Sequence, residues 1–208
     1  MLMISTYEEL LASGAELLAL DARAVRASID VVAGLTSADL DAPTPCAGWT
    51  LRDLLEHMIV QHRGFAAAAH GESDLALWKP QPLGGDPVGE YRAAAEHVLA
   101  AFAEPGVLER QFPLPEIRDG IVIAAPLAIS FHFIDYIVHT WDVARALGQP
   151  VEFDADLISA GLPVAEAVPR GPERERPGAS FAPEVSAPEA SGLDRILAVL
   201  GRAPGRPE

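Results

Sequence analysis

The chain contains the stretch FHFIDYIVHTWDVARALG between Phe131 and Gly148. Four polar side chains lie in it at successive spacings of three, four and three residues: His132, Asp135, His139 and Asp142. On an α-helix, which turns by about 100° per residue, all four fall within an arc of about 80°. Their neighbours are apolar, so the segment is predicted to be a buried helix with one polar stripe. Buried imidazole and carboxylate groups need partners, and a divalent cation bound by Asp135 and His139 is the simplest one.

A third ligand is expected from the segment TPCAGWTLRDLLEHM, which spans residues 44–58. Thr50, followed three residues later by Asp53, is a typical N-terminal cap, so a helix is predicted from this point to about His70. His57 lies on the inner face of that helix. An Asp-x-x-x-His pair on one helix needs at least one further ligand, and three protein ligands with an open position are typical of a catalytic zinc site.

Three segments, TPCAGWTLRDLLEH, DYIVHTWDVARALG and LDRILAVLGR, occur in this order along most of the chain. Together they resemble actinobacterial metal-binding proteins of the DinB-like superfamily, in the branch that includes mycothiol-dependent maleylpyruvate isomerase. The resemblance implies an all-α bundle holding one divalent metal, zinc or nickel, through His57, Asp135 and His139. The isomerase has a glutamate where this chain has Asp135, whose side chain is one methylene shorter.

The elements expected along the chain agree with a DinB-like four-helix bundle. Helices are predicted from residues 6 to 34, with Ser5 or Thr6 as the cap, from 50 to 70, and from 125 to 147. Another helix, between the second and the last of these, has Tyr91, Ala95, Val98 and Phe102 on one face and stops before Pro105. A small β-hairpin, made of VLERQFPL and GIVIA, should precede the last long helix. The bundle is assigned to residues 1–150. Residues 151–208 are expected to form a partly mobile helical extension packed on it, with helices at 154–168 and 193–201 and a surface loop at 169–180.

Composition limits the classes of partner. Half of the 208 residues are hydrophobic, and 15 basic against 30 acidic residues give a net charge of −15. This charge disfavours nucleic acids and anionic membranes. The sequence has neither a run of about 18 apolar residues nor a signal-peptide pattern at MLMISTYEELL, so a cytoplasmic protein is expected, as a monomer or homodimer. The only cysteine, Cys46, excludes an internal disulfide and a multi-cysteine zinc site.

Three further residues are predicted to border a substrate pocket at the metal: Trp49, His132 and Trp141. For each tryptophan the alternative is a core residue, and a histidine such as His132 on an apolar helix more often hydrogen-bonds within the core than binds a ligand. Asp142 is expected to orient a ligand rather than to be one. Cys46 is more readily interpreted as a small hydrophobe than as a nucleophile.

For the remaining polar residues, the sequence gives weaker indications of a functional role. Arg63 and Arg145 lie on the two metal-bearing helices, where an anion site and a surface salt bridge are both possible, and the salt bridge is favoured. His62, His70 and His97 are interpreted as exposed and receive no role.

The sequence is compatible with three functions. By resemblance, the first is a thiol-dependent transferase or isomerase acting on a small electrophile, with mycothiol as cosubstrate and a thiolate activated by the metal. The second is a hydrolase or lyase that uses metal-activated water. The third is a non-catalytic module that binds a metal or ligand. A requirement for an external thiol distinguishes the first from the second, and turnover of any kind excludes the third.

Overall fold

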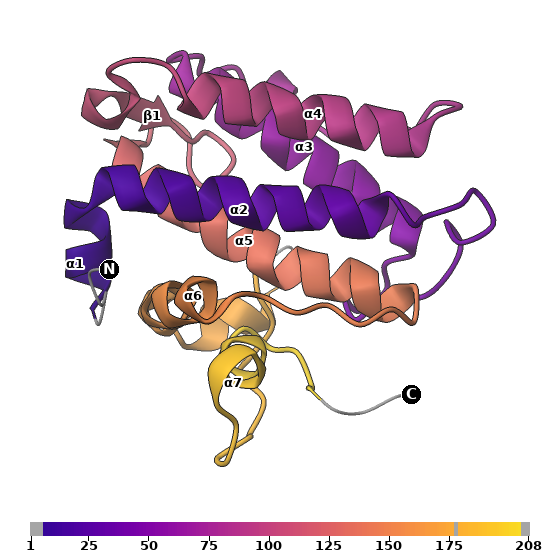
Figure 1. Cartoon of the computed structure of the whole chain (residues 1–208). Helices are drawn as coiled ribbons and strands as arrows, with labels where there is room; N and C mark the ends of the chain where they lie inside the picture. Colours follow the sequence, from indigo (N-terminus) through magenta and orange to yellow (C-terminus); the bar gives the residue numbers. More distant parts are fainter. Residues whose placement is uncertain (1–5, 177–178, 205–208) are drawn as a thin grey trace. The chain divides into compact units, whose positions relative to one another are not determined.

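Four long helices form the core of the structure, a computed structural model that describes residues 6–176 and 179–204 (Figure 1). They are α2 (Gly14–Val32), α3 (Leu51–Ala69), α4 (Pro87–Phe102) and α5 (Ala125–Ala146). Helices α2 and α3 each pack against both α4 and α5. This arrangement confirms the expected helical bundle. Each of these helices has two neighbours, so more than one of its sides is buried. In α3, for example, most residues beyond Leu54 are buried.

The helix ends follow local sequence signals. Thr50 Oγ1 accepts a hydrogen bond from the Asp53 amide, and the Asp53 carboxylate accepts one from the Thr50 amide, which completes the capping box expected for α3. Asp86 caps α4 by accepting from the Gly89 amide. After α5, Gly148 adopts a φ of +64°, a left-handed conformation that glycine tolerates without strain and that terminates the helix.

The first predicted helix is interrupted, contrary to expectation. Helix α1 (Tyr7–Ala12) ends before Ser13, whose φ of −96° and ψ of 53° are not helical, and α2 begins at Gly14. Serine and glycine both disfavour the helix interior, which accounts for a break at this pair. Thr6 caps α1 by accepting from the Glu9 amide. The alternative cap, Ser5, lies outside the described residues.

A short hairpin precedes α5, as predicted. Strands β1 (Gln111–Pro113) and β2 (Val122–Ala124) pair antiparallel, with Phe112 opposite Ile123. Phe112 is fully buried, so the hairpin is anchored in the core. The strand expected to begin at residue 107 starts with a 3-10 turn instead, η2 (Val107–Glu109), and a second such turn, η1 (Leu75–Trp78), follows α3.

The chain divides into two compact units. The bundle unit is Leu11–Glu152, and the second unit comprises the described residues of Met1–Leu10 and Phe153–Glu208. In the second unit α6 (Ala155–Ala167) packs against α7 (Gly192–Val199), and Pro163 does not break α6. The assignment of domains to residues 1–150 and 151–208, and the packing of the extension, stay predictions.

Part of the segment expected to be a surface loop is ordered by one buried side chain. Residues Pro172–Glu175 form the 3-10 turn η3. The guanidinium of Arg174 is buried and donates to the carbonyls of Pro169, Val168 and Val199. Within residues 6–176 and 179–204, no helix is long and apolar enough to span a membrane.

Candidate metal centre

The structure brings His57, Asp135 and His139 together, and we call these three residues the triad. One donor atom from each lies within 4.8 Å of the other two. His139 Nε2 is 3.4 Å from Asp135 Oδ1, and the His57 and His139 rings lie 5.1 Å apart between centroids. Asp135 and His139 come from adjacent turns of α5, whereas His57 comes from the start of α3. Packing of α3 against α5 therefore closes the cluster.

The triad lies at the edge of the core. The side chain of His139 is 4% exposed, that of Asp135 is 20% exposed, and His57 is half-buried. Trp49 stands at the outer side, with its ring 5.0 Å from that of His57 and 36% of the residue exposed. A small molecule could therefore approach the cluster from the side of Asp135 and Trp49.

Asp142 and Cys46 flank the other nitrogen of His139. Asp142 Oδ2 lies 2.9 Å from His139 Nδ1 and accepts a hydrogen bond from it, because an ionised carboxylate can only accept hydrogen bonds. The thiol of Cys46 donates to the same oxygen over 3.3 Å. Asp142 is fully buried. With Nδ1 protonated, the lone pair of a neutral His139 ring is on Nε2, which faces the triad.

The protonation of His139 reflects the negative charge around it. Burial by itself lowers the pKa of His139, but the charge of Asp135, the hydrogen bonds with Asp142 and Cys46, and the charge of Asp142 raise it to about 10. The metal-free ring therefore holds both protons at neutral pH. A cation bound at Nε2 would replace one of those protons and compensate the same carboxylates.

A further carboxylate, not anticipated from the sequence, lies close to the triad. Gln61 follows His57 by one helical turn, and its amide nitrogen donates to both carboxylate oxygens of Glu116, over 2.8 and 2.9 Å. Burial of the carboxylate raises the pKa of Glu116, the Gln61 hydrogen bond lowers it, and the charge of Asp135 raises it further. No sequence signal marks Glu116, because it lies in the loop between β1 and β2.

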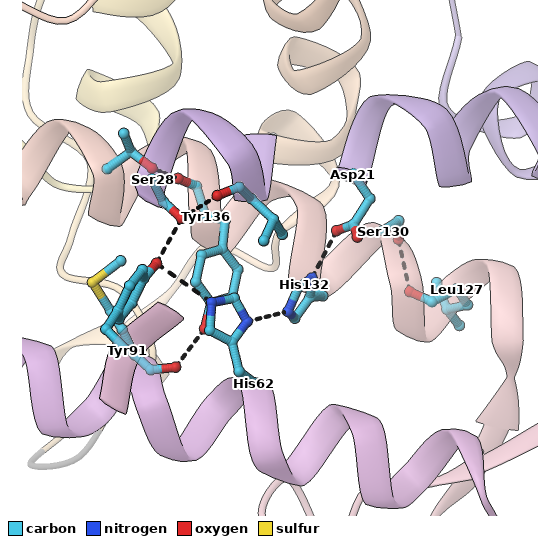
Figure 2. Close-up of polar contacts among 11 residues, drawn as sticks. Asp21, Ser28, His62, Tyr91, Leu127, Ser130, His132 and Tyr136 are labelled. Atoms are coloured by element: carbon cyan, nitrogen blue, oxygen red, sulfur yellow. Dashed lines mark hydrogen bonds and ion pairs between the residues drawn. The ribbon is translucent and has the colours of Figure 1, made fainter. Parts of the chain in front are cut away.

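A separate buried network crosses the bundle (Figure 2). His132 Nδ1 lies 2.7 Å from Asp21 Oδ1, and its Nε2 lies 3.1 Å from His62 Nδ1. His62 Nε2 is 3.4 Å from the hydroxyl of Tyr91, which donates to Ser28 over 2.6 Å. These residues come from all four long helices. Both ring nitrogens of His132 are thus engaged and its side chain is fully buried, so its predicted role in substrate binding has no support in this geometry.

The expectation that His62 is exposed is wrong, because its side chain is fully buried. Its ring stacks on that of Tyr136, with centroids 3.9 Å apart, and the Tyr136 hydroxyl donates to the carbonyl of Met58. Burial, with a smaller effect of the neighbouring His132, holds the pKa of His62 well below its usual value. His62 lies on the side of α3 opposite His57. That opposite side is covered by α4 and the core of the bundle.

The other residues singled out in the sequence lie at the surface or in intermediate positions. Trp141 is half-buried and directly precedes Asp142. Arg63 and Arg145 are exposed. His70 and His97 are exposed as expected, and His70 forms an ion-pair contact of 2.9 Å with Glu104.

The donor set fits a divalent cation. Two imidazoles and one carboxylate make up a ligand set of catalytic zinc sites, in which a carboxylate commonly holds the second nitrogen of a histidine. Asp142 occupies that position behind His139.

Comparison with known proteins identifies a matching family, related sequences and a related fold. Residues 22–144 match the family described as the mycothiol maleylpyruvate isomerase N-terminal domain. Uncharacterised proteins from two strains of Mycobacterium tuberculosis are each 31% identical over 188 residues, or 86% of this chain and 94% of theirs. A crystal structure of a histidine-to-alanine mutant of mycothiol-dependent maleylpyruvate isomerase matches with a TM-score of 0.57 at 14% identity, covering 99% of this chain and 85% of that one. This likeness shows the DinB-like helical fold.

Proposed function

Since the chain belongs to the mycothiol maleylpyruvate isomerase N-terminal domain family, we propose that it is a metal-dependent enzyme acting on a small electrophile together with a low-molecular-weight thiol. Mycothiol is the first candidate for the thiol, and the reaction class is transfer or isomerisation. His57, Asp135 and His139 would hold one divalent cation, zinc or nickel. A cation there would lower the pKa of a bound thiol and so favour its thiolate form at neutral pH.

The convergence of the three triad donors is the observation that carries the proposal. Asp142 supports it by accepting a hydrogen bond from His139 Nδ1, so the Nε2 proton is the one that a cation would replace. The half-exposed ring of Trp49 beside His57 would form one wall for the substrate. Trp141 stays a candidate for a second wall.

Glu116 would take part in proton transfer beside the triad. Its carboxylate is oriented by Gln61, and burial, together with a smaller effect of the charge of Asp135, raises its pKa above the usual value, so the carboxyl group holds a proton more readily. It is therefore the residue best suited to hold or deliver a proton to an electrophile beside the triad.

The test uses cobalt as a spectroscopic probe of sulfur. Because Cys46 is the only cysteine, the Cys46→Ser variant contains no thiol of its own. When this variant is loaded with Co²⁺ and mixed with mycothiol, we expect a sulfur-to-cobalt charge-transfer band. The same variant with His139→Ala added should lack the band. Absence of the band at saturating mycothiol, together with turnover of a substrate in thiol-free buffer, would contradict thiol activation and favour hydrolysis or elimination instead.

A further inference from the structure

The two ring nitrogens of His139 face two different sets of donors. Nε2 faces the triad, whereas Nδ1 faces Asp142 and Cys46. The donor atoms of Cys46, His139 and Asp142 also lie within 4.8 Å of one another. Asp142 and His139 are buried and Cys46 is partly buried. This second set contains the only sulfur donor that a cysteine of the chain can supply.

We propose that Cys46, His139 and Asp142 form a second cation position, here called the sulfur seat, which selects thiophilic divalent ions and competes with the triad for His139. The position of its own three donors supports the sulfur seat. The competition for His139 rests in addition on the proposed function of the triad.

The spacing of the donors requires little rearrangement. Ligands at typical metal–ligand distances around a tetrahedral cation lie roughly 3.5 Å from one another. Asp142 Oδ2 is 2.9 Å from His139 Nδ1 and 3.3 Å from Cys46 Sγ. These two separations are close to those around a bound ion, and the donor atoms of Cys46 and His139 lie within 4.8 Å of each other.

The loop that carries Cys46 is held in place by its own hydrogen bonds. The Cys46 amide donates to Thr44 Oγ1 over 3.2 Å, and the Trp49 amide donates to the Cys46 carbonyl over 2.9 Å. Pro43 and Thr50 form a bridge across the base of the loop. A fixed backbone reduces the entropy lost when Cys46 binds an ion, so the seat is preorganised.

Ligand chemistry separates the two positions. Thiolate selects soft ions, whereas the imidazole and carboxylate donors of the triad also suit harder ones. A cation in the sulfur seat releases two protons to solvent, one from the Cys46 thiol and one from His139 Nδ1, and leaves the neutral His139 ring with its remaining proton on Nε2. A neutral imidazole has a single lone pair, so His139 cannot bind both cations at once. A thiophilic ion in the sulfur seat should therefore empty the triad.

Cadmium titration of the full chain tests the seat directly. Any thiolate-to-cadmium charge-transfer band must come from Cys46, because the chain has no other cysteine. We expect wild type to bind one Cd²⁺ with this band, and His57→Ala to keep both the stoichiometry and the band. Cys46→Ser should lose the band and bind Cd²⁺ through the triad alone, and His139→Ala should lose the band as well. Far-UV circular dichroism confirms that each variant is folded.

Three results would overturn the proposal. Absence of the band in both wild type and His57→Ala at saturating Cd²⁺ would exclude the seat. A band in wild type that disappears in His57→Ala would mean that the thiol joins the triad cation. Binding of two Cd²⁺ ions by wild type at neutral pH, with the band present, would exclude competition for His139. None of these results depends on turnover, so failure of the seat and failure of the proposed function are distinguishable.

Discussion

His139 connects every part of the candidate site, because it contacts Asp135 on one side and Asp142 and Cys46 on the other. Among the three proposed ligands, Asp135 is the one whose residue type differs from that of the isomerase that the sequence resembles. Its carboxylate contributes a negative charge that a neutral amide cannot replace. The role of Asp135 as a ligand can therefore be separated from its role in packing.

Replacement of Asp135 by asparagine should weaken zinc binding by about tenfold or more. Loss of a carboxylate that only hydrogen-bonds to a metal ligand already lowers metal affinity by that factor. Asp135→Glu should remain within a few-fold of the parent. Both affinities are measured by chelator competition in the Cys46→Ser background, which removes the sulfur seat. If Asp135→Asn retained full affinity while His132→Ala lost it, His132 would be the third ligand.

At the level of single residues, the sequence predicts contacts within one helix better than contacts between helices. Helical spacing placed Asp135 next to His139 because both lie on α5. By contrast, His132 meets Asp21 across 111 residues and Cys46 meets Asp142 across 96, and no local pattern encodes such pairs. The exposure of His62 was misjudged for the same reason, since α3 buries the side opposite His57 as well.

At the level of elements, the buried His62–His132 pair links α3 to α5, and burial of His62 lowers the stability of the fold at acidic pH. An unfolded histidine titrates near 6.5, whereas the pKa of His62 in the folded chain is well below this value. The unfolded state thus binds more protons once the pH falls below about 6.5. Stability from neutral His62 is complete above that pH and is lost progressively as the pH decreases.

Replacement of His62 by phenylalanine should therefore flatten the pH dependence of the free energy of unfolding below about pH 6.5. One histidine contributes a slope of up to about 1.4 kcal/mol per pH unit. Phenylalanine can keep the stacking on Tyr136, although its loss of hydrogen bonds should lower stability at every pH. Urea unfolding from pH 7 to pH 5 gives the slope, with exposed His97→Gln as the control. An unchanged slope in His62→Phe would assign the acid sensitivity to other groups.

The start of α3 positions His57, so its capping box is a second target at this scale. Replacement of Thr50 by alanine removes the oxygen that accepts from the Asp53 amide and should cost about 1 kcal/mol of unfolding free energy. Thr50→Ser keeps an acceptor and should remain close to wild type in urea unfolding. Equal stability of Thr50→Ala and wild type would mean that the cap adds nothing to α3.

Helix type and order were predictable because apolar periodicity, caps and breakers are local signals. Thr50 with Asp53 marked the start of α3, and Gly148 marked the end of α5. The break at Ser13 was missed because the apolar spacing continues through it, so the periodicity concealed two poor helix formers. The order in segment 169–180 was missed because it depends on Arg174, whose carbonyl partners include the distant Val199.

At the scale of the whole molecule, the proposed cation would join two helices that are far apart in the sequence. His57 lies on α3 and His139 on α5, so a cation held by both would add a direct link between these two packed helices. Substitution of either histidine should therefore have the same effect on metal content. Substitution of an exposed histidine should have none.

The most direct measurement is zinc content by elemental analysis after dialysis, in the Cys46→Ser background so that the triad alone is measured. The background protein and its His97→Ala variant should hold about one ion per chain. The variants with His57→Ala or His139→Ala added should hold almost none while remaining folded by circular dichroism. Full zinc occupancy in both of these folded variants would contradict the assignment of His57, Asp135 and His139 as the metal site.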